Sequence, residues 1–167
     1  MTEGQFIKEV ERAQGPLRRF LRVLCGGDGF AADDIAQDAL MKAWLHFGNF
    51  SGRSRFTTWL YRIAYNCWYD SRCHGRGGRQ NLLSLDEAVA CEIHGDDAGC
   101  PDRYAELYQA IDGLSGAEKI VVLLFYMEER SVKEIEMITG FPSGTVRSHL
   151  SRARNHLRKS LETIDKI

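Results

Sequence analysis

The sequence contains no long apolar run and no recognisable export signal. Nowhere in its 167 residues do apolar side chains approach the ~20 consecutive positions that a bilayer-spanning helix needs. The first ten residues also lack the positively charged segment followed by an apolar one that is typical of a secretory signal. We therefore expect a cytoplasmic protein without membrane insertion. Because 44% of its residues are hydrophobic, wholesale disorder is excluded.

Cysteine is too scarce and too irregularly spaced for a disulfide framework, since the five cysteines are an odd number in a chain without an export signal. Zinc accepts cysteine and histidine ligands. The candidates are Cys73, His74, Cys91, His94 and Cys100. They lack the two tight pairs of a zinc site, so we expect free thiols and no metal. No Ser-His-Asp, Cys-His or glycine-rich phosphate-binding arrangement stands out, and we expect no cofactor, no catalytic residue and no enzymatic activity.

An excess of charge of one sign is also lacking. The net charge is -1, from 22 Lys+Arg and 23 Asp+Glu, which taken alone argues against a nucleic-acid-binding protein. The charges are segregated, however. Residues 51–80 hold six arginines and one acid, residues 81–118 hold nine acids and one arginine, and residues 143–160 hold five cations and no acid. Two basic blocks flank an acidic block, so nucleic-acid binding has to be judged block by block.

Apolar residues recur at helical spacing along most of the chain, and nowhere convincingly at strand spacing, which predicts an all-α fold. In the first part of the chain, glycine and proline separate four such patterns. The first predicted helix ends near Gly15, and the second runs from Pro16 to about Leu24. The third runs from about Asp33 to Phe47, and the fourth from about Phe56 to Cys73. Together they would form one compact four-helix domain over residues 1–75, with Phe56, Trp59, Leu60, Ile63, Ala64 and Cys67 of the last helix buried.

Residues 76–101 are rich in glycine and acids, and predict a flexible acidic linker with one short helix near residues 85–91. Residues 102–167 then predict a second small helical domain. Its predicted helices run from about Asp102 to Gly113, Ala117 to Glu129, Val132 to Thr139, and from the turn at residues 140–144 to near the end. A short helix, a tight turn and a longer helix are typical of a helix-turn-helix.

The last predicted helix has one apolar face and one polar, cationic face. Val146, Leu150, Ala153, Leu157 and Leu161 share the face expected to be buried. The opposite face carries the Ser, Asn and Arg donors that hold phosphates and read guanine edges in a major groove. An ordinary amphipathic helix with a solvated cationic face is the alternative, but the preceding short helix and turn favour DNA binding.

The helix predicted at residues 56–73 also has a second face, which mixes cations, aromatic rings and an amide. Such a surface can hold phosphates while its rings stack on unpaired bases. Its residues are Arg62, Tyr65, Asn66, Tyr69, Arg72 and Arg76. Alternatively, Tyr65 and Tyr69 complete the core. A polar stripe on the preceding helix, at Asp34, Gln37, Asp38 and Met41, is by itself ordinary solvated surface.

Taken together, these segments resemble the sigma-70 family of bacterial RNA polymerase sigma factors. The motifs are Asp34-Ile-Ala-Gln-Asp38 with Lys42-Ala-Trp44 for region 2.2; Phe56 to Asn66 with Asp70 and Arg72 for regions 2.3 and 2.4; and Leu114 to Glu118, Glu134-Ile135 and Gly144 to Arg154 for region 4. They occur in the order of the family. A short N-terminus and an acidic linker in place of region 3 are similar to the extracytoplasmic-function (ECF) group.

The resemblance implies a role for each segment. Core polymerase would be bound by Asp34, Gln37, Asp38 and Met41. The minus-ten element would be contacted by Arg53, Arg55, Phe56, Trp59, Arg62, Tyr65, Asn66, Tyr69, Arg72 and Arg76, with Asn66 and the loop at residues 50–57 capturing a flipped base. The minus-thirty-five element would be contacted by Thr145, Arg147, Ser148, His149, Ser151, Arg152, Asn155 and Arg158.

The sequence thus predicts an alternative sigma factor whose partners are core RNA polymerase and promoter DNA, and the resemblance implies an anti-sigma factor as well. One rival hypothesis is a stand-alone helix-turn-helix repressor or activator, which leaves the basic, aromatic face and the Asp34 stripe without a role. Another is a small metal-dependent hydrolase that uses the Cys/His set. A metal assay without stoichiometric zinc would count against the hydrolase.

Overall fold

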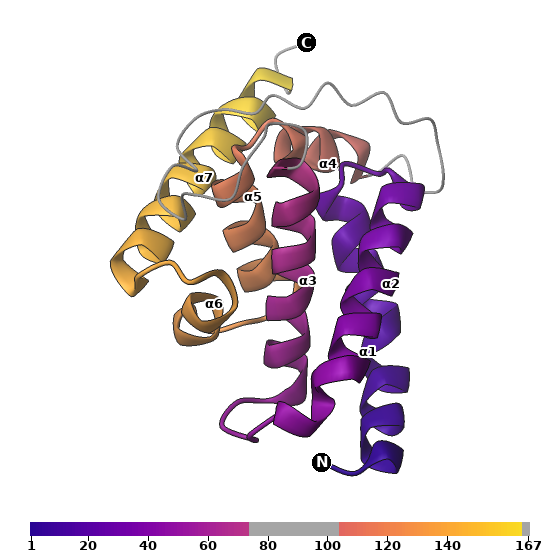
Figure 1. Ribbon diagram of the computed structural model, residues 1–167. Helices are drawn as coiled ribbons and strands as arrows, with labels where there is room; N and C mark the ends of the chain where they lie inside the picture. The colour runs from indigo at the N-terminus through magenta and orange to yellow at the C-terminus, as the bar shows by residue number, and fades with distance from the viewer. Residues whose placement is uncertain (74–103, 165–167) are drawn as a thin grey trace. The chain divides into compact units, whose positions relative to one another are not determined.

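The computed structural model describes residues 1–73 and 104–164, and within these ranges every regular element is helical (Figure 1). This confirms the predicted all-α fold. The chain divides into two compact units, with α1 to α3 in the first and α4, α5 and α7 in the second. The predicted boundaries at 75/76 and 101/102, the acidic linker and its short helix lie outside the described residues.

The first helix, α1 (Glu3–Leu24), is continuous where the sequence predicts two helices, and Pro16 lies inside it. Proline lacks an N–H and usually interrupts a helix, which is why the sequence predicts an end near Gly15. The apolar stripe nevertheless continues across the proline, with Ala13 and Leu17 both buried. Burial of the whole stripe outweighs one missing hydrogen bond. The prediction of four helices in this domain was therefore wrong, because the described residues hold three α-helices before residue 74.

The next two helices match their predictions closely. α2 (Gly29–His46) begins before its predicted start because the carboxylate of Asp28 accepts a hydrogen bond from the Ala31 N–H at 3.0 Å, and Asp is a favoured N-cap. It ends in a short 3-10 turn, η1 (Phe47–Asn49). α3 (Phe56–Cys73) has the predicted bounds.

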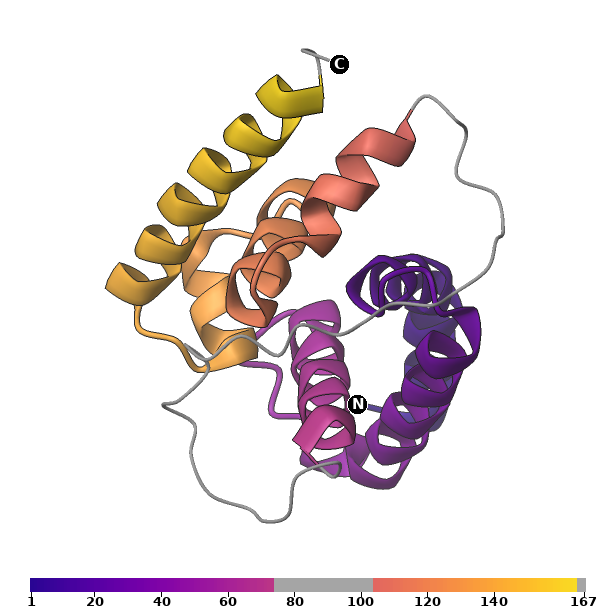
Figure 2. The same ribbon diagram turned by 90° about the horizontal axis from the view of Figure 1, so that it is seen from above.

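The core of the first unit forms where α1, α2 and α3 lie side by side (Figures 1 and 2). Alanines of α2 keep the helices close, while α1 and α3 supply the large side chains. The fully buried residues include Leu17, Phe20, Leu21, Leu24, Ala36, Ala39, Ala43, Leu60, Tyr61, Ala64 and Trp68. Of the α3 residues predicted to be buried, Phe56, Leu60, Ala64 and Cys67 are buried, whereas Trp59 and Ile63 are half-buried.

The second unit is built around a long last helix. The elements after residue 103 are α4 (Ala105–Asp112), α5 (Gly116–Val122), the π-helical segment η3 (Leu123–Met127), α6 (Val132–Thr139) and α7 (Ser143–Ile164). The α6 bounds are those predicted. The single helix predicted over residues 117–129 is instead α5 followed by η3, whose wider turn leaves both Leu123 and Leu124 buried.

α7 packs on α4 and α5, and α6 ends at the turn that precedes α7 (Figure 1). Gly140 has a φ of 79°, a left-handed conformation that favours glycine, and it ends α6. The large side chains that are fully buried here include Ile120, Leu124, Ile135 and Ile138 before the turn, and Val146 and Leu150 are buried after it. α7 therefore has one face fixed against the core, which leaves its other face available to solvent.

Candidate functional site

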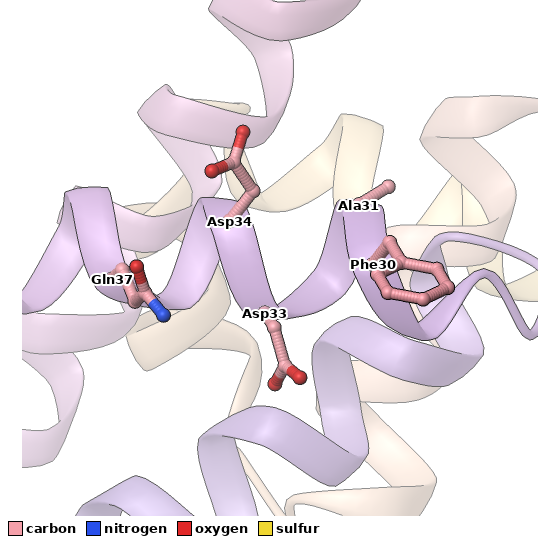
Figure 3. Close-up of a pocket in the computed structure, with 5 residues that line it drawn as sticks. All are labelled: Phe30, Ala31, Asp33, Asp34 and Gln37. Atoms are coloured by element: carbon pink, nitrogen blue, oxygen red, sulfur yellow. The ribbon is translucent and has the colours of Figure 1, made fainter.

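The polar stripe of α2, formed by Asp34, Gln37, Asp38 and Met41, is exposed along its whole length, as the sequence predicts. The opposite face of the helix holds Ala32, Ile35, Ala36, Ala39 and Ala43, all buried. Figure 3 shows Asp34 and Asp33 pointing to different sides of α2. Asp33 binds Arg18 of α1 at 2.9 Å, so it ties the two helices together, while Asp34 belongs to the outward stripe.

Two apolar side chains that the sequence analysis did not single out extend the α2 stripe. Phe30, four residues before Asp34, is 93% exposed, and Leu45, four residues after Met41, is 69% exposed. Phe30 also borders a shallow hollow of about 540 Å³ with Asp34 and Gln37 (Figure 3). Exposed apolar side chains that rim an acidic centre are typical of a protein-binding surface. Continuing the helical spacing by one turn at each end would have identified both residues.

The outer face of α3 is only partly a surface. Arg62 and Asn66 are exposed, one turn apart, whereas Tyr69 and Arg72 are half-buried and Tyr65 is buried. The rings of Tyr65 and Tyr69 lie 6.3 Å apart. Tyr65 therefore completes the core, which is the alternative that the sequence left open, and Arg62 and Asn66 remain as the groups that a nucleic acid could reach. Arg76 lies outside the described residues.

Tyr65 gives a prediction for the pH dependence of stability. Desolvation by burial, reinforced by Tyr69, raises the pKa of Tyr65 from 10.0 to about 12. As the pH rises, the unfolded state therefore loses the Tyr65 proton before the folded state does. The contribution of Tyr65 to the free energy of unfolding is fully present below pH 10 and is lost as the pH rises through 12. We expect the midpoint of thermal unfolding to fall by several degrees over this range, and to fall less in Tyr65→Phe. Parallel curves for the two proteins would contradict the assignment.

The loop before α3 borders a hollow of about 740 Å³ that also reaches the first turns of α1. Its lining residues are Met1, Gln5, Glu9, Phe50, Ser51, Gly52, Ser54, Arg55, Phe56 and Thr57. Of the predicted contact residues, Arg53 and Arg55 are exposed, Trp59 is half-buried, and Phe56 is buried. Trp59 packs on Phe50 and Phe56 at 5.3 and 5.7 Å. Asn66 does not line this hollow, so the loop and Asn66 are two separate candidate contact points for a nucleic acid.

α7 presents the polar face that the sequence predicts. Val146, Leu150 and Ala153 are buried, and Leu157 and Leu161 are half-buried. The exposed α7 polar face consists of Arg147, Ser148, Ser151, Arg152, Asn155 and Arg158. Two other predicted contact residues are less accessible, since Thr145 is half-buried and His149 is buried. The exposed set offers cationic and hydroxyl donors along one side of a rigid helix, the arrangement that suits a groove of duplex DNA.

Tyr126 of η3 adds a group beside this face that the sequence analysis missed. The Arg154 Nε donates a hydrogen bond to the Tyr126 hydroxyl at 2.7 Å, and its guanidinium lies 5.9 Å from the ring centre. Arg154 falls three residues after Ser151, at helical spacing on the side of the polar face. The pair thus holds one more cation in place next to that face. No sequence signal connects two residues 28 positions apart.

Neither a metal centre nor a membrane span is found in the described ranges. Residues 1–73 and 104–164 contain no group of three or more His, Cys, Asp or Glu side chains placed to hold a metal ion. Of the Cys/His set considered above, only Cys73 falls in these ranges, and the rest lies outside the described residues. None of the described helices is both long enough and apolar enough to cross a bilayer.

Two family models match the chain, one in each unit. The model described as sigma-70 region 2 matches residues 10–76, which include α2 and α3. The model described as sigma-70, region 4 matches residues 104–157, which include the helix-turn-helix. The α2 stripe, the α3 face and, apart from Arg158, the α7 polar face therefore fall within matched segments.

Relatives match over nearly the whole chain. The ECF RNA polymerase sigma factor SigW of Bacillus subtilis is 31% identical over 148 residues, which cover 83% of this chain and 79% of the relative. The RNA polymerase sigma-H factor of Pseudomonas aeruginosa is 34% identical over 169 residues, which cover 95% of this chain and 84% of the relative.

Two solved structures are also similar. The sigma factor RpoE from Bartonella quintana, crystallised with the anti-sigma factor NepR, has a TM-score of 0.74 at 30% identity and covers 95% of this chain and 97% of its own. CnrH, in complex with the cytosolic domain of CnrY, has a TM-score of 0.70 at 21% identity, covers 97% of this chain and 90% of its own, and supports the fold alone.

Proposed function

The chain belongs to the ECF group of the sigma-70 family, and on this premise we propose that it acts as an alternative RNA polymerase sigma factor. It binds core RNA polymerase, recognises the minus-thirty-five and minus-ten promoter elements and promotes promoter melting. The observation that carries this function is the amphipathic α7, whose apolar face is buried while six polar side chains face solvent directly after a helix-turn-helix turn.

In this proposal the α2 stripe binds core polymerase. Asp34 and Asp38 supply negative charge, and Met41 supplies an apolar contact that is 60% exposed. Phe30 and Leu45 lengthen the apolar part of the surface at both ends. Complementary charge steers association and fixes the register of the two partners, while the apolar side chains supply affinity when they are buried.

The outer face of α3 and the loop hollow act on the melted minus-ten strand. The exposed guanidinium groups of Arg53, Arg55 and Arg62 hold its phosphates. A flipped base enters the hollow beside the loop, and Asn66 contacts the strand farther along α3. Capture of this kind needs no nucleotide hydrolysis, because binding of the unstacked base offsets the few kcal/mol of unstacking.

α7 docks its polar face in the major groove of the minus-thirty-five element. Arg147, Ser148, Ser151 and Arg152 lie nearest the turn, where the first residues of a recognition helix reach base edges. Asn155 and Arg158 lie farther along and contact the backbone. The proposal assigns phosphate contacts to position the helix and base contacts to specify the sequence.

We further propose that the protein is bound by an inhibitor, acts in the cytoplasm and catalyses no reaction. The similar structure of RpoE holds the anti-sigma factor NepR, and we expect an anti-sigma factor for this chain as well. Its place of action is the cytoplasm, where core polymerase and promoters are found. It performs no reaction of its own. A stand-alone repressor is not favoured, because the region 2 match gives α2 and α3 roles that a repressor would not use.

The proposed function is tested by mixing the purified protein with bacterial core polymerase. We expect a stable complex and transcription that depends on a cognate promoter sequence selected from a random library by that complex. A protein that binds a palindromic duplex as a dimer without core polymerase, and forms no complex with core, would support the repressor instead.

Asn66→Ala separates melting from duplex binding. In the proposal the exposed amide of Asn66 hydrogen-bonds to the melted strand and not to the closed duplex. Loss of such hydrogen bonds should reduce open-complex formation by about 5- to 10-fold, while closed-complex affinity changes by less than about 2-fold. Permanganate reactivity of unpaired thymines reports the first quantity and binding at low temperature the second. Arg62→Ala, one turn away, should lower both, and equal losses for Asn66→Ala would contradict the contact of Asn66 with the melted strand.

A further inference from the structure

His149 is one of the predicted DNA contacts on α7, yet its side chain is buried and lies beside the α7 polar face rather than within it. The residue is 5% exposed, and its ring packs 5.4 Å from the ring of Phe141 in the turn before α7. The sequence predicts a DNA contact at this position. A side chain covered in this way has little surface to offer a base edge, and a buried polar ring needs hydrogen-bond partners inside the protein.

Arg152, one helical turn later, supplies a partner. A terminal guanidinium nitrogen of Arg152 lies 3.4 Å from Nδ1 of His149. A guanidinium has donors only, so Nδ1 must be the acceptor and the imidazole proton resides on Nε2. The Arg152 side chain is otherwise exposed. One end of the contact is therefore anchored in the core and the other end projects from the polar face.

We infer that His149 is a positioning residue that orients the guanidinium of Arg152 for base readout. The inference rests on the proposed function, because it assumes that α7 enters the major groove. Bidentate recognition of guanine requires the planar guanidinium to face the base edge, and a free arginine samples many rotamers. A fixed acceptor one turn back removes part of that freedom before DNA binds, which lowers the entropic cost of the contact.

The residues around His149 support a role in orienting Arg152 in addition to packing. Phe141 follows Gly140 directly, so the turn that starts α7 also fixes the surface against which the imidazole ring lies. Arg158 gives the contrast, because its neighbour is the exposed carboxylate of Glu162 at 4.0 Å, a surface pair that constrains little. The Nδ1 contact at 3.4 Å is long for a hydrogen bond, so it narrows the rotamers of Arg152 without locking the side chain.

Two substitutions of His149 that match each other in shape test the inference. His149→Asn keeps an acceptor near the position of Nδ1, whereas His149→Leu has the same branched shape without one. Each is made with Arg152 present and with Arg152→Ala, assembled with core polymerase, and titrated onto a matched promoter and a promoter with one minus-thirty-five base pair changed. We expect His149→Leu to reduce the discrimination ratio by about 3- to 10-fold, and His149→Asn to retain it within about 2-fold. In the Arg152→Ala background both changes should have no effect on the ratio.

The outcomes are distinguishable. If Arg152→Ala alone leaves the ratio unchanged, base readout by this face of α7 is wrong, and with it part of the proposed function. His149 does not act through Arg152 if Arg152→Ala lowers the discrimination ratio but His149→Leu does not. The same conclusion follows if His149→Leu lowers the ratio equally in the Arg152→Ala background. Thermal unfolding of each variant checks the fold, and His149→Gln, whose acceptor is displaced, replaces His149→Leu if the leucine variant is unfolded.

Discussion

Asp38→Arg is expected to weaken the complex with core RNA polymerase by roughly 30-fold or more, because a lost charge pair at an interface costs about 2 kcal/mol or more and reversal adds repulsion. Asp38 is exposed in the middle of the α2 stripe, so the substitution should leave the fold and its midpoint of thermal unfolding nearly unchanged. Affinity is measured by competition with a labelled sigma factor for limiting core polymerase.

The matched control for this experiment is Glu11→Arg. Glu11 is an exposed acid on α1, so its replacement makes the same change in net charge outside the stripe. Its affinity for core polymerase should stay within about 2-fold of the unmodified protein, as expected for a screened surface charge. Equal affinities for the Asp38 and Glu11 variants would remove the α2 stripe as the docking surface.

The helix ends show what sequence patterns can and cannot determine. α3 and α6 have their predicted bounds because periodic apolar residues end where the helix does. Pro16 misled the prediction for α1, since the local cost of a proline is easy to see in a sequence and the gain from burying a continuous stripe depends on partners from α2 and α3. Asp28 was missed because a cap is a geometric relation between a side chain and an N–H.

The candidate surfaces show the same limit. Helical spacing correctly grouped the α2 stripe and the α7 polar face, because residues three and four apart share a face. Spacing cannot tell whether a neighbouring segment covers that face. Tyr65 belongs to the face predicted on α3 and is buried. His149, a DNA contact implied by the family resemblance, is buried as well, and its covering ring comes from Phe141 in the preceding turn. Phe30 shows the reverse, an aromatic residue that nothing in the described parts of the chain covers.

The remaining prediction compares two arginines of α7 that differ in their distance from the turn. Arg152 and Arg158 are both exposed. At about 1.5 Å of rise per residue, their six-residue separation places Arg158 about 9 Å farther along the helix axis. The first turns of a recognition helix lie deepest in the groove, so we expect Arg152 to reach guanine O6 and N7 and Arg158 to reach a backbone phosphate.

Arg152→Ala should therefore reduce discrimination at one or two minus-thirty-five base pairs by about 1 to 3 kcal/mol, which is the value of a good bidentate contact. Arg158→Ala should weaken binding to all sequences alike and lower the salt dependence of log K by about one, because one phosphate contact fewer releases about one counterion fewer. Its ion pair with Glu162 is exposed and long at 4.0 Å, so that partner should add little to the effect. Titration of holoenzyme onto matched and singly substituted duplexes at several salt concentrations measures both quantities. If Arg152→Ala weakens every duplex equally and changes the salt slope as Arg158→Ala does, both arginines contact phosphate, and specificity must come from other residues of the face.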